Sequence, residues 1–383
     1  MTHRVFPGLR DLDDITTTTA IPQCPVRHSP SGQHFVLGHP EVTQAAADPD
    51  TFSASVSPRV SVPNSMDGAE HAAYRTIIDS YFTAARMATF EPTCRAITRD
   101  LMSQLTFGAP TDVMDTLAQP FANRVQSAFM GWPTTLQRPL EEWVRKNHAA
   151  TRAQDRAAMI RVATEFDGYI VEQLQVRRNN PTMTDVTADL VRETRDGVPL
   201  TDEQLVSLIR NWTVGELATI AASVGIIVAW LAAHPRESAQ VRDLHALGLD
   251  MAVVSDEILR LHSPFLASRR RTTTDTTVAG DMIAAESRVN LMWATANLDP
   301  RAFPNPLDFD PLRNQDANVL YGHGTHYCPG KPLAHLELRI ILDELFTHTT
   351  HITPAWDGDL PRQALYPTAG FTEVPVILHR THG

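Results

Sequence analysis

Cysteine is scarce in this chain of 383 residues, which contains only Cys24, Cys94 and Cys328. The three residues are far apart, their number is odd, and no CxxC pair occurs. A disulfide framework and a paired-cysteine metal or redox site are therefore not expected, and a reducing compartment is favoured. This scarcity predicts a cytoplasmic protein.

Long apolar runs and excess basic charge are also lacking. The N-terminal stretch MTHRVFPGLRDLDD has no apolar core of a signal peptide, and the longest apolar run, at residues 220–233, is shorter than the roughly 20 residues that span a bilayer. The formal net charge of −11 argues against broad nucleic-acid binding and against an anionic membrane surface as partner. We therefore expect neither nucleic acid nor a membrane among the partners.

Helical periodicity is what the chain does have. From Glu70 to about Trp230, apolar residues recur at helical spacing between turn signals, and a further helix is expected over residues 250–262. Short β-prone segments follow to about residue 315, then a last long helix and a strand at VPVILH. No repeat or linker divides the chain. The pattern predicts a mostly α fold with a small β subdomain, in one domain over residues 1–383.

One cysteine stands in an unusual setting, the stretch YGHGTHYCPG. Gly322, Gly324 and Gly330 surround Cys328 there, and glycine permits close backbone approach. A predicted helix begins just after the cysteine, and a helix start with free N–H groups lowers the pKa of a thiol. The loop is therefore suited to hold sulfur as an anion against a large flat partner.

Several interpretations of this cysteine stay open on the residues alone. It could be a buried structural cysteine, or a nucleophile paired with His326, although no clear orienting group follows. A zinc site of His323, His326 and Cys328 lacks a second ligand pair, and a dinucleotide loop lacks a preceding strand. The remaining interpretation is haem iron ligated by a thiolate, where sulfur helps O–O cleavage.

The same loop resembles the haem-binding signature of the cytochrome P450 family. The matching aromatic, glycine, basic and cysteine positions are Tyr321 (where the family usually has Phe), Gly322, Gly324, His326, Cys328 and Gly330. The resemblance implies that Cys328 is the axial ligand of haem b, and that the fold is that of a single-domain cytochrome P450.

A second match lies upstream of the loop. The stretch EILR supplies Glu257 and Arg260, which resemble the family's Glu-x-x-Arg pair, and Arg313 matches the residue that this pair binds. The i, i+3 spacing places both on one helix face. The resemblance implies that the three residues support the cysteine loop.

Basic residues at three further places resemble those that bind the haem carboxylates. EHAAYR supplies His71 and Arg75, like the family's His-x-x-x-Arg, and SRRRTTTDTTVAG supplies Arg270 in a strand region. With His326, these side chains are expected to pair with the porphyrin propionates. Taken singly, each could instead be a solvated surface charge.

The central helix departs from the family pattern, which is Ala-Gly-x-(Asp/Glu)-Thr. In NWTVGELATIAASVG, one register puts Leu217 and Ala218 at the acid and threonine positions, and the other puts Ala218 and Thr219 there. We prefer the second, because the distance from Thr219 to Pro235 then matches the family. No acid directly precedes a threonine in either register. Glu216 and Thr219 are therefore a candidate displaced proton relay; otherwise Glu216 is a buried or capping carboxylate, and Thr219 bonds to the preceding turn.

The resemblance implies a haem-thiolate monooxygenase that activates O2 to hydroxylate or dealkylate a small to medium organic molecule. Electrons would come from a ferredoxin or flavodoxin and its reductase, and Lys331 and Arg339 are candidates for the docking face. The altered central helix leaves peroxide-driven oxidation or oxidative coupling as an alternative, and a non-catalytic haem or ligand-binding protein as a further one.

Substrate contacts are expected from four segments of the chain. They are the loop at residues 54–66, a helix pair and turn near 160–185, the central helix, and the stretch at 263–268 with Phe265 and Leu266. The last two residues are wall candidates that could equally belong to the core.

Overall fold

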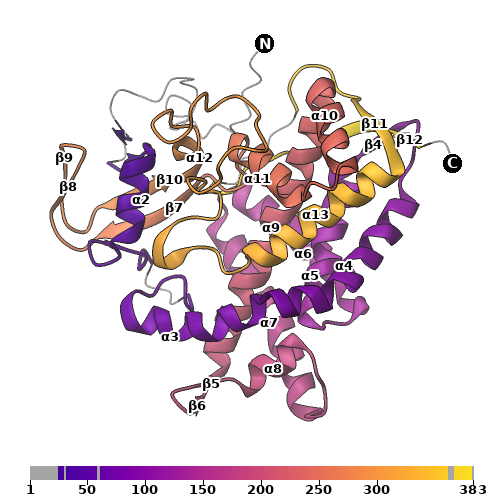
Figure 1. Cartoon of the computed structure of the whole chain (residues 1–383). Coiled ribbons are helices and arrows are strands. Elements are labelled where there is room, and N and C mark those ends of the chain that lie inside the picture. Colours follow the sequence, from indigo (N-terminus) through magenta and orange to yellow (C-terminus); the bar gives the residue numbers. More distant parts are fainter. Residues whose placement is uncertain (1–24, 30–31, 58–60, 361–365, 382–383) are drawn as a thin grey trace.

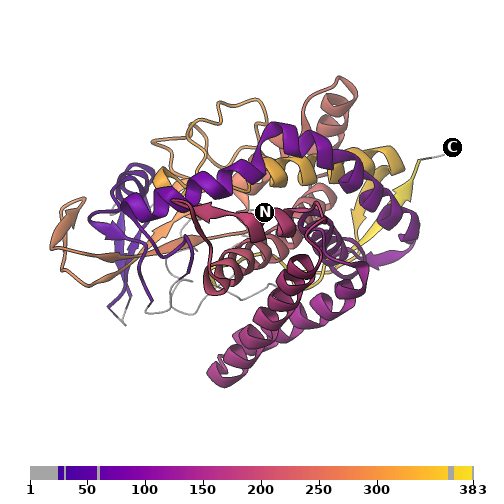
Figure 2. The same cartoon turned by 90° about the horizontal axis from the view of Figure 1, so that it is seen from below.

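Helices gather around one long helix, α9, in the computed structural model (Figure 1), which describes residues 25–29, 32–57, 61–360 and 366–381. In chain order the helices are α2 His39–Ala47, α3 Gly68–Asp79, α4 Ala84–Gln104, α5 Gln119–Met130, α6 Gln137–Arg152, α7 Arg156–Asn179, α8 Val186–Arg192, α9 Asp202–Ala233, α10 Pro235–Ala246, α11 Met251–Leu261, α12 Trp293–Ala296 and α13 Lys331–His348. Figure 2 shows α4 running beside α13, with which it packs.

The central helix α9 begins and packs as its sequence predicts. The Thr201 hydroxyl accepts from the Gln204 N–H while the Gln204 side chain accepts from the Thr201 N–H, which forms a capping box. In the part of the chain that the structure describes, α9 is the one helix long and apolar enough to cross a membrane. However, 72% of its most apolar window is buried inside the protein, as in the core helix of a soluble protein.

The strands form two small sheets and two hairpins. They are β1 Val26–His28, β2 His34–Val36, β3 Phe52–Ser53, β4 Pro110–Asp112, β5 Thr194–Arg195, β6 Val198–Pro199, β7 Ala267–Thr272, β8 Thr276–Val278, β9 Asp281–Ile283, β10 Arg288–Met292, β11 Thr349–Pro354 and β12 Pro375–Arg380. The larger sheet has the order β1-β2-β10-β7-β3, and the smaller one β11-β12-β4; β5-β6 and β8-β9 are the hairpins.

Register in the larger sheet positions one functional side chain. Strand β10 pairs antiparallel with β7, so that Arg270 lies opposite Val289, and parallel with β2. Side chains alternate along β7, which exposes Arg269 and buries Arg270. A charged residue is thereby directed into the protein.

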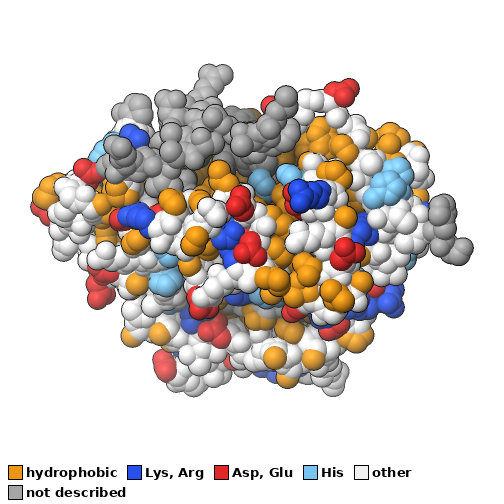
Figure 3. Space-filling model, turned by 45° about the horizontal axis from the view of Figure 1, so that its top comes forward, with side chains coloured by type: hydrophobic (Ala, Val, Ile, Leu, Met, Phe, Trp, Pro, Cys, Tyr) orange, Lys and Arg blue, Asp and Glu red, His pale blue; other side chains and the backbone are white. Residues whose placement is uncertain are grey.

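The expected fold class is confirmed: the protein is mostly helical, with a small β part. One large apolar core lies among the helices, and a smaller one lies against the larger sheet. On the face seen in Figure 3, acidic and basic side chains are interspersed with apolar ones.

A helix pair and a turn were expected near residues 160–185, and the structure has α7 and α8 there, with the turn at 180–185 between them. A second turn, at 153–155, separates α6 from α7. Gln154 takes a positive φ of 51° there, and the Asp155 side chain accepts from the Ala158 N–H to cap α7.

Candidate active site

The cysteine loop packs backbone to backbone against α2. The Cys328 N–H donates to the Tyr321 carbonyl oxygen at 2.9 Å. Gly324 has φ of +73°, and a Cβ there would lie 2.5 Å from the Ala46 carbonyl oxygen, so only glycine fits. Gly322 is also left-handed, with φ of +79°, whereas Gly330, the residue before α13, has an ordinary φ of −77°.

Opposing influences act on the Cys328 thiol. Burial raises the pKa of Cys328, and this effect outweighs the backbone N–H groups of Gly330 and Lys331 and the charge of Arg75, which lower it. The local N–H groups lower the pKa of Cys328, as expected from the sequence. The net pKa of the thiol is nevertheless raised, because burial has the larger effect. A bound metal cation would reverse the balance and hold the sulfur as a thiolate.

The aromatic residue that opens the loop is anchored to α11. The Tyr321 hydroxyl donates to Asp256 Oδ1 at 3.0 Å, and Asp256 Oδ2 is 2.9 Å from His335 Nε2 of α13. Sequence reasoning missed Asp256 and His335. Their signals were weak: Asp256 precedes Glu257, and His335 is one polar residue on a largely apolar helix.

The predicted charged trio beneath the loop forms and is confirmed. Arg260 Nε and Nη2 donate to the two Glu257 carboxylate oxygens at 2.8 and 2.9 Å, and Arg313 Nε donates to Glu257 Oε1 at 2.9 Å. Arg260 also donates to the carbonyl oxygens of Asn297 and Pro306. The Glu257 and Arg260 side chains are 0% exposed, so these bonds offset a large desolvation cost.

Basic side chains gather on another side of the loop. The rings of His71 and His326 lie 4.1 Å apart, and His326 Nε2 is 3.1 Å from Asp67 Oδ1. Burial lowers the pKa of His71 to about 4, helped by the charges of His326 and Arg75. Burial also lowers the pKa of His326, with Arg270 contributing. Asp67, which sequence reasoning missed, is the acid that faces this cluster.

Arg75 differs from the other basic residues because its guanidinium braces the loop. Its Nη1 donates to the carbonyl oxygens of Thr325 and Tyr327 at 3.0 and 2.7 Å, and its Nε donates to Asp79 at 2.9 Å. Among the described residues, Arg270 instead donates to the Arg269 carbonyl oxygen. Within the described ranges, no carboxylate lies within ion-pair distance of Arg270.

This arrangement fits a haem. Burial raises the pKa of the Cys328 thiol, which a bound metal cation would lower, and among the described residues the buried Arg270 has no carboxylate within ion-pair distance. The two propionates of a porphyrin would supply a carboxylate partner for Arg270 and add negative charge beside the histidines. Among the residues described, no group of three or more His, Cys, Asp or Glu could hold a metal ion, so the zinc alternative gains no support.

The central helix places its two candidate relay residues apart. The Thr219 hydroxyl donates to the Gly215 carbonyl oxygen at 2.8 Å, the bond to the preceding turn that was the alternative to a relay. No Glu216–Thr219 hydrogen bond forms. The Glu216 carboxyl faces Glu337 of α13 instead, a residue that sequence reasoning also missed.

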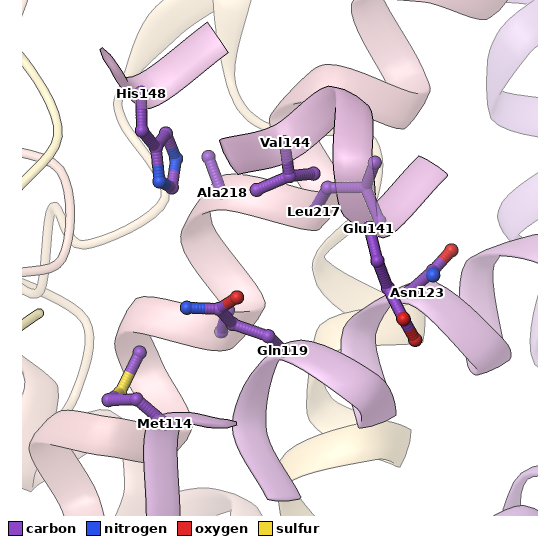
Figure 4. A pocket seen from close by; sticks show the side chains of 9 residues that line it. Met114, Gln119, Asn123, Glu141, Val144, His148, Leu217 and Ala218 are labelled. Carbon is purple, nitrogen blue, oxygen red and sulfur yellow. The ribbon is translucent and has the colours of Figure 1, made fainter. Parts of the chain in front are cut away.

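Ala218 points in a third direction, into a separate pocket between α5, α6 and α9 (Figure 4). The pocket is small, and Gln119, Asn123, Glu141 and His148 contribute its polar lining. Ala218 therefore adjoins polar groups of neighbouring helices without supplying one.

The remaining candidates have mixed surroundings. Leu266 is 1% exposed and belongs to a small apolar core, whereas Phe265 is half-buried. Arg339 is bound to Glu91, and Lys331 lies over the Tyr321 ring. Residues 58–60 of the expected substrate loop, and Cys24, lie outside the described residues.

Known proteins share this architecture. The family model described as Cytochrome P450 matches residues 91–361. The chain is 30% identical to the erythromycin C-12 hydroxylase of Saccharopolyspora erythraea, over 92% of this chain and 91% of that protein. It is 28% identical to the cyclomarin C epoxidase CymV of Salinispora arenicola, over 82% of each chain. A structure of a P450 EryK mutant with erythromycin B covers 97% of this chain and 96% of its own, with a TM-score of 0.86 and 28% identity.

Proposed function

The chain belongs to the cytochrome P450 family of O2-dependent haem b monooxygenases, and from this premise we propose that Cys328 is the axial ligand of its haem. The observation that carries the assignment is the setting of the thiol. Backbone N–H groups at the start of α13 face it, and the Tyr321 hydroxyl ties the loop to Asp256 of α11. Next to Asp256, Glu257 binds Arg313 of the segment before the loop. The whole chain, residues 1–383, would act as one catalytic domain.

The basic cluster would bind the propionates. We assign this role to His71, Arg270 and His326, because these residues are crowded together with few anions. Arg75 adds positive charge there, but its bonds to the loop make it mainly a brace. Gly322, Gly324 and Gly330 allow the loop to approach the porphyrin, and Tyr321 holds the start of the loop in place.

The haem, when bound, supplies the oxygen chemistry, and the protein's task is to orient substrate and move protons. Thr219 presents a hydroxyl from α9 that can hold a proton or a water. Ala218 occupies the position of the family's acid and cannot donate. Glu216 is the carboxyl of this helix segment that can.

The substrate is an organic molecule, and the relatives' names indicate where to begin. Erythromycin B and cyclomarin C are the first compounds to test. One related structure contains erythromycin B, and one relative is named for cyclomarin C. Electrons would come from a ferredoxin or flavodoxin with its reductase, in the cytoplasm. The peroxide-driven or coupling alternative is not favoured, since the named relatives are hydroxylases and an epoxidase.

The absorption spectrum of the purified protein, reduced and exposed to carbon monoxide, tests the assignment. We expect a Soret band at the long-wavelength position of a thiolate opposite CO. Cys328→Ala should abolish that band, and Cys94→Ala, which changes a buried cysteine of α4, should keep it. A long-wavelength band that survives in Cys328→Ala would overturn the assignment.

A further inference from the structure

Two buried carboxyl groups meet where α9 packs on α13. They belong to Glu337, whose side chain is fully buried, and to Glu216, which is half-buried as a residue but whose Oε1 is shielded from solvent. Neither oxygen of Glu337, nor Oε1 of Glu216, receives a hydrogen bond from an N–H or hydroxyl group of the described residues. The hydrogen-bonding group that each carboxyl does face is the other carboxyl.

Two carboxylates cannot both stay ionised in such a place. Burial removes the water that stabilises the charge, and a second negative charge beside the first adds repulsion. Burial accordingly raises the pKa of Glu216, and burial together with the Glu216 charge raises the pKa of Glu337 well above its ordinary value. The titratable groups facing the pair from other elements are Cys94 of α4 and Cys328, and neither is a cation. A proton is therefore the counter-charge left to the pair.

The pair lies beside the part of α9 that departs from the family pattern. Glu216 precedes Thr219 by one helical turn, and it adjoins Gly215, whose carbonyl oxygen accepts the Thr219 hydroxyl. Its charge also reaches the Cys328 thiol, so the pair belongs to the surroundings of the proposed haem. At Ala218, where the family has its acid, this chain has only a methyl group.

We propose that Glu216 and Glu337 share one proton, and that this pair is the acid that supplies protons to Thr219 in place of Ala218. The inference rests on the proposed function, because it needs oxygen reduction at a haem held by Cys328. The O–H bond of the pair breaks as its proton moves to Thr219 Oγ1 or to a water held there, which passes its own proton to the oxygen substrate. Water in the active site then reprotonates the pair.

The shared proton has a readout that does not depend on turnover. Infrared spectra of the resting holoenzyme at neutral pH should show a protonated-carboxyl band that shifts in D2O. Glu337→Gln should remove the band, because an amide can donate to the Glu216 carboxylate but carries no acidic proton. Glu344→Gln is the matched control: Glu344 lies on the same helix and is also buried, but it is paired with Arg95 and Arg99. No such band in the wild type, or an unchanged band in Glu337→Gln, would overturn proton sharing.

Proton delivery is tested by oxygen consumption of the holoenzyme with a ferredoxin and its reductase, without an organic substrate. We expect Glu337→Gln and Glu216→Gln to consume O2 about 10-fold more slowly or worse, with a larger solvent isotope effect, and Glu344→Gln to match the wild type. The CO spectrum should stay unchanged in all three. If Glu337→Gln loses the infrared band but keeps its rate, delivery by the pair is refuted. A wild type without the thiolate–CO band would instead refute the proposed function.

Discussion

The cysteine loop and the adjoining segment of α9 satisfy their charged groups in opposite ways. Below the loop, the Glu257 carboxylate binds two arginines, and Asp256 binds the Tyr321 hydroxyl. On α9, the Glu216 carboxyl faces the Glu337 carboxyl, and its Oε1 receives no hydrogen bond from the described residues. Paired charges hold a segment in one geometry, whereas an unpaired buried acid retains a proton. The comparison indicates that the loop is built to stay fixed and that the helix is built to hold and release a proton.

The largest effect should come from breaking the charged trio. Glu257→Gln leaves Arg260 buried without the negative charge of its partner, and should lower the free energy of unfolding by about 3–5 kcal/mol in urea titrations. Glu142→Gln is the control, because its pair with Arg138 is exposed, and a change within about 0.5 kcal/mol is expected. Equal losses in the two variants would contradict the view that the trio anchors the loop.

The loop was predictable because its contacts follow from one short stretch. The spacing of Gly322, Gly324 and Cys328 is visible in the sequence, and the Glu257–Arg260 pair is local to one helix. The fold class was predictable because helical periodicity persists over long stretches. The turn that ends α7 was predictable because Asn180 and Pro181 are strong turn signals, whereas a capping Asp155 after a left-handed Gln154 gives a weaker signal for the turn between α6 and α7.

A smaller effect should come from filling the space at the tip of the loop. Gly324→Ala and Gly248→Ala both put a side chain on left-handed backbone, which costs about 1–2 kcal/mol. At Gly324 the new Cβ would also collide with the Ala46 carbonyl oxygen. A Cβ at Gly248 would have no atom within 4 Å. We therefore expect Gly324→Ala to lose about 1–3 kcal/mol more, and to retain less haem in absorption spectra. Similar losses at both positions would mean that the loop can shift away from α2.

The basic cluster predicts a pH dependence of stability. The pKa of His71 falls from its ordinary 6.5 to about 4 on folding, so the unfolded chain binds more protons between these values. Stability therefore falls as the pH drops from 6.5 toward 4, by about 2 kcal/mol from this residue. Thermal unfolding of the haem-free wild type should show this loss relative to His71→Gln.

Repeating the measurement with haem bound gives a second test of the cluster. Propionates beside His71 would raise its pKa again, so the difference between wild type and His71→Gln should shrink when haem is bound. The same pH dependence with and without haem would mean that the cluster does not face the propionates.

The carboxyl pair could not be predicted from the sequence, for a physical reason. Glu216 and Glu337 lie on helices far apart in the chain, and an isolated glutamate on a helix usually faces water. The one sign that Glu337 is buried was its position between Leu336 and Leu338 among many apolar residues. Helical periodicity does not predict which residue it contacts. Only the packing of α9 on α13 brings the two acids together.

The smallest effect on stability should come from Thr219. Its hydroxyl donates to a carbonyl oxygen of its own helix, so Thr219→Val should change the free energy of unfolding by no more than about 0.5 kcal/mol and leave the CO spectrum intact. If the hydroxyl also passes protons from the carboxyl pair, Thr219→Val should release more of the consumed O2 as hydrogen peroxide, and Thr219→Ser should behave like the wild type. Peroxide release that is equal in all three proteins would show that the hydroxyl serves only the helix. Protons would then have to leave Glu216 through water alone, and the contrast between a fixed loop and a proton-carrying helix would rest on the carboxyl pair.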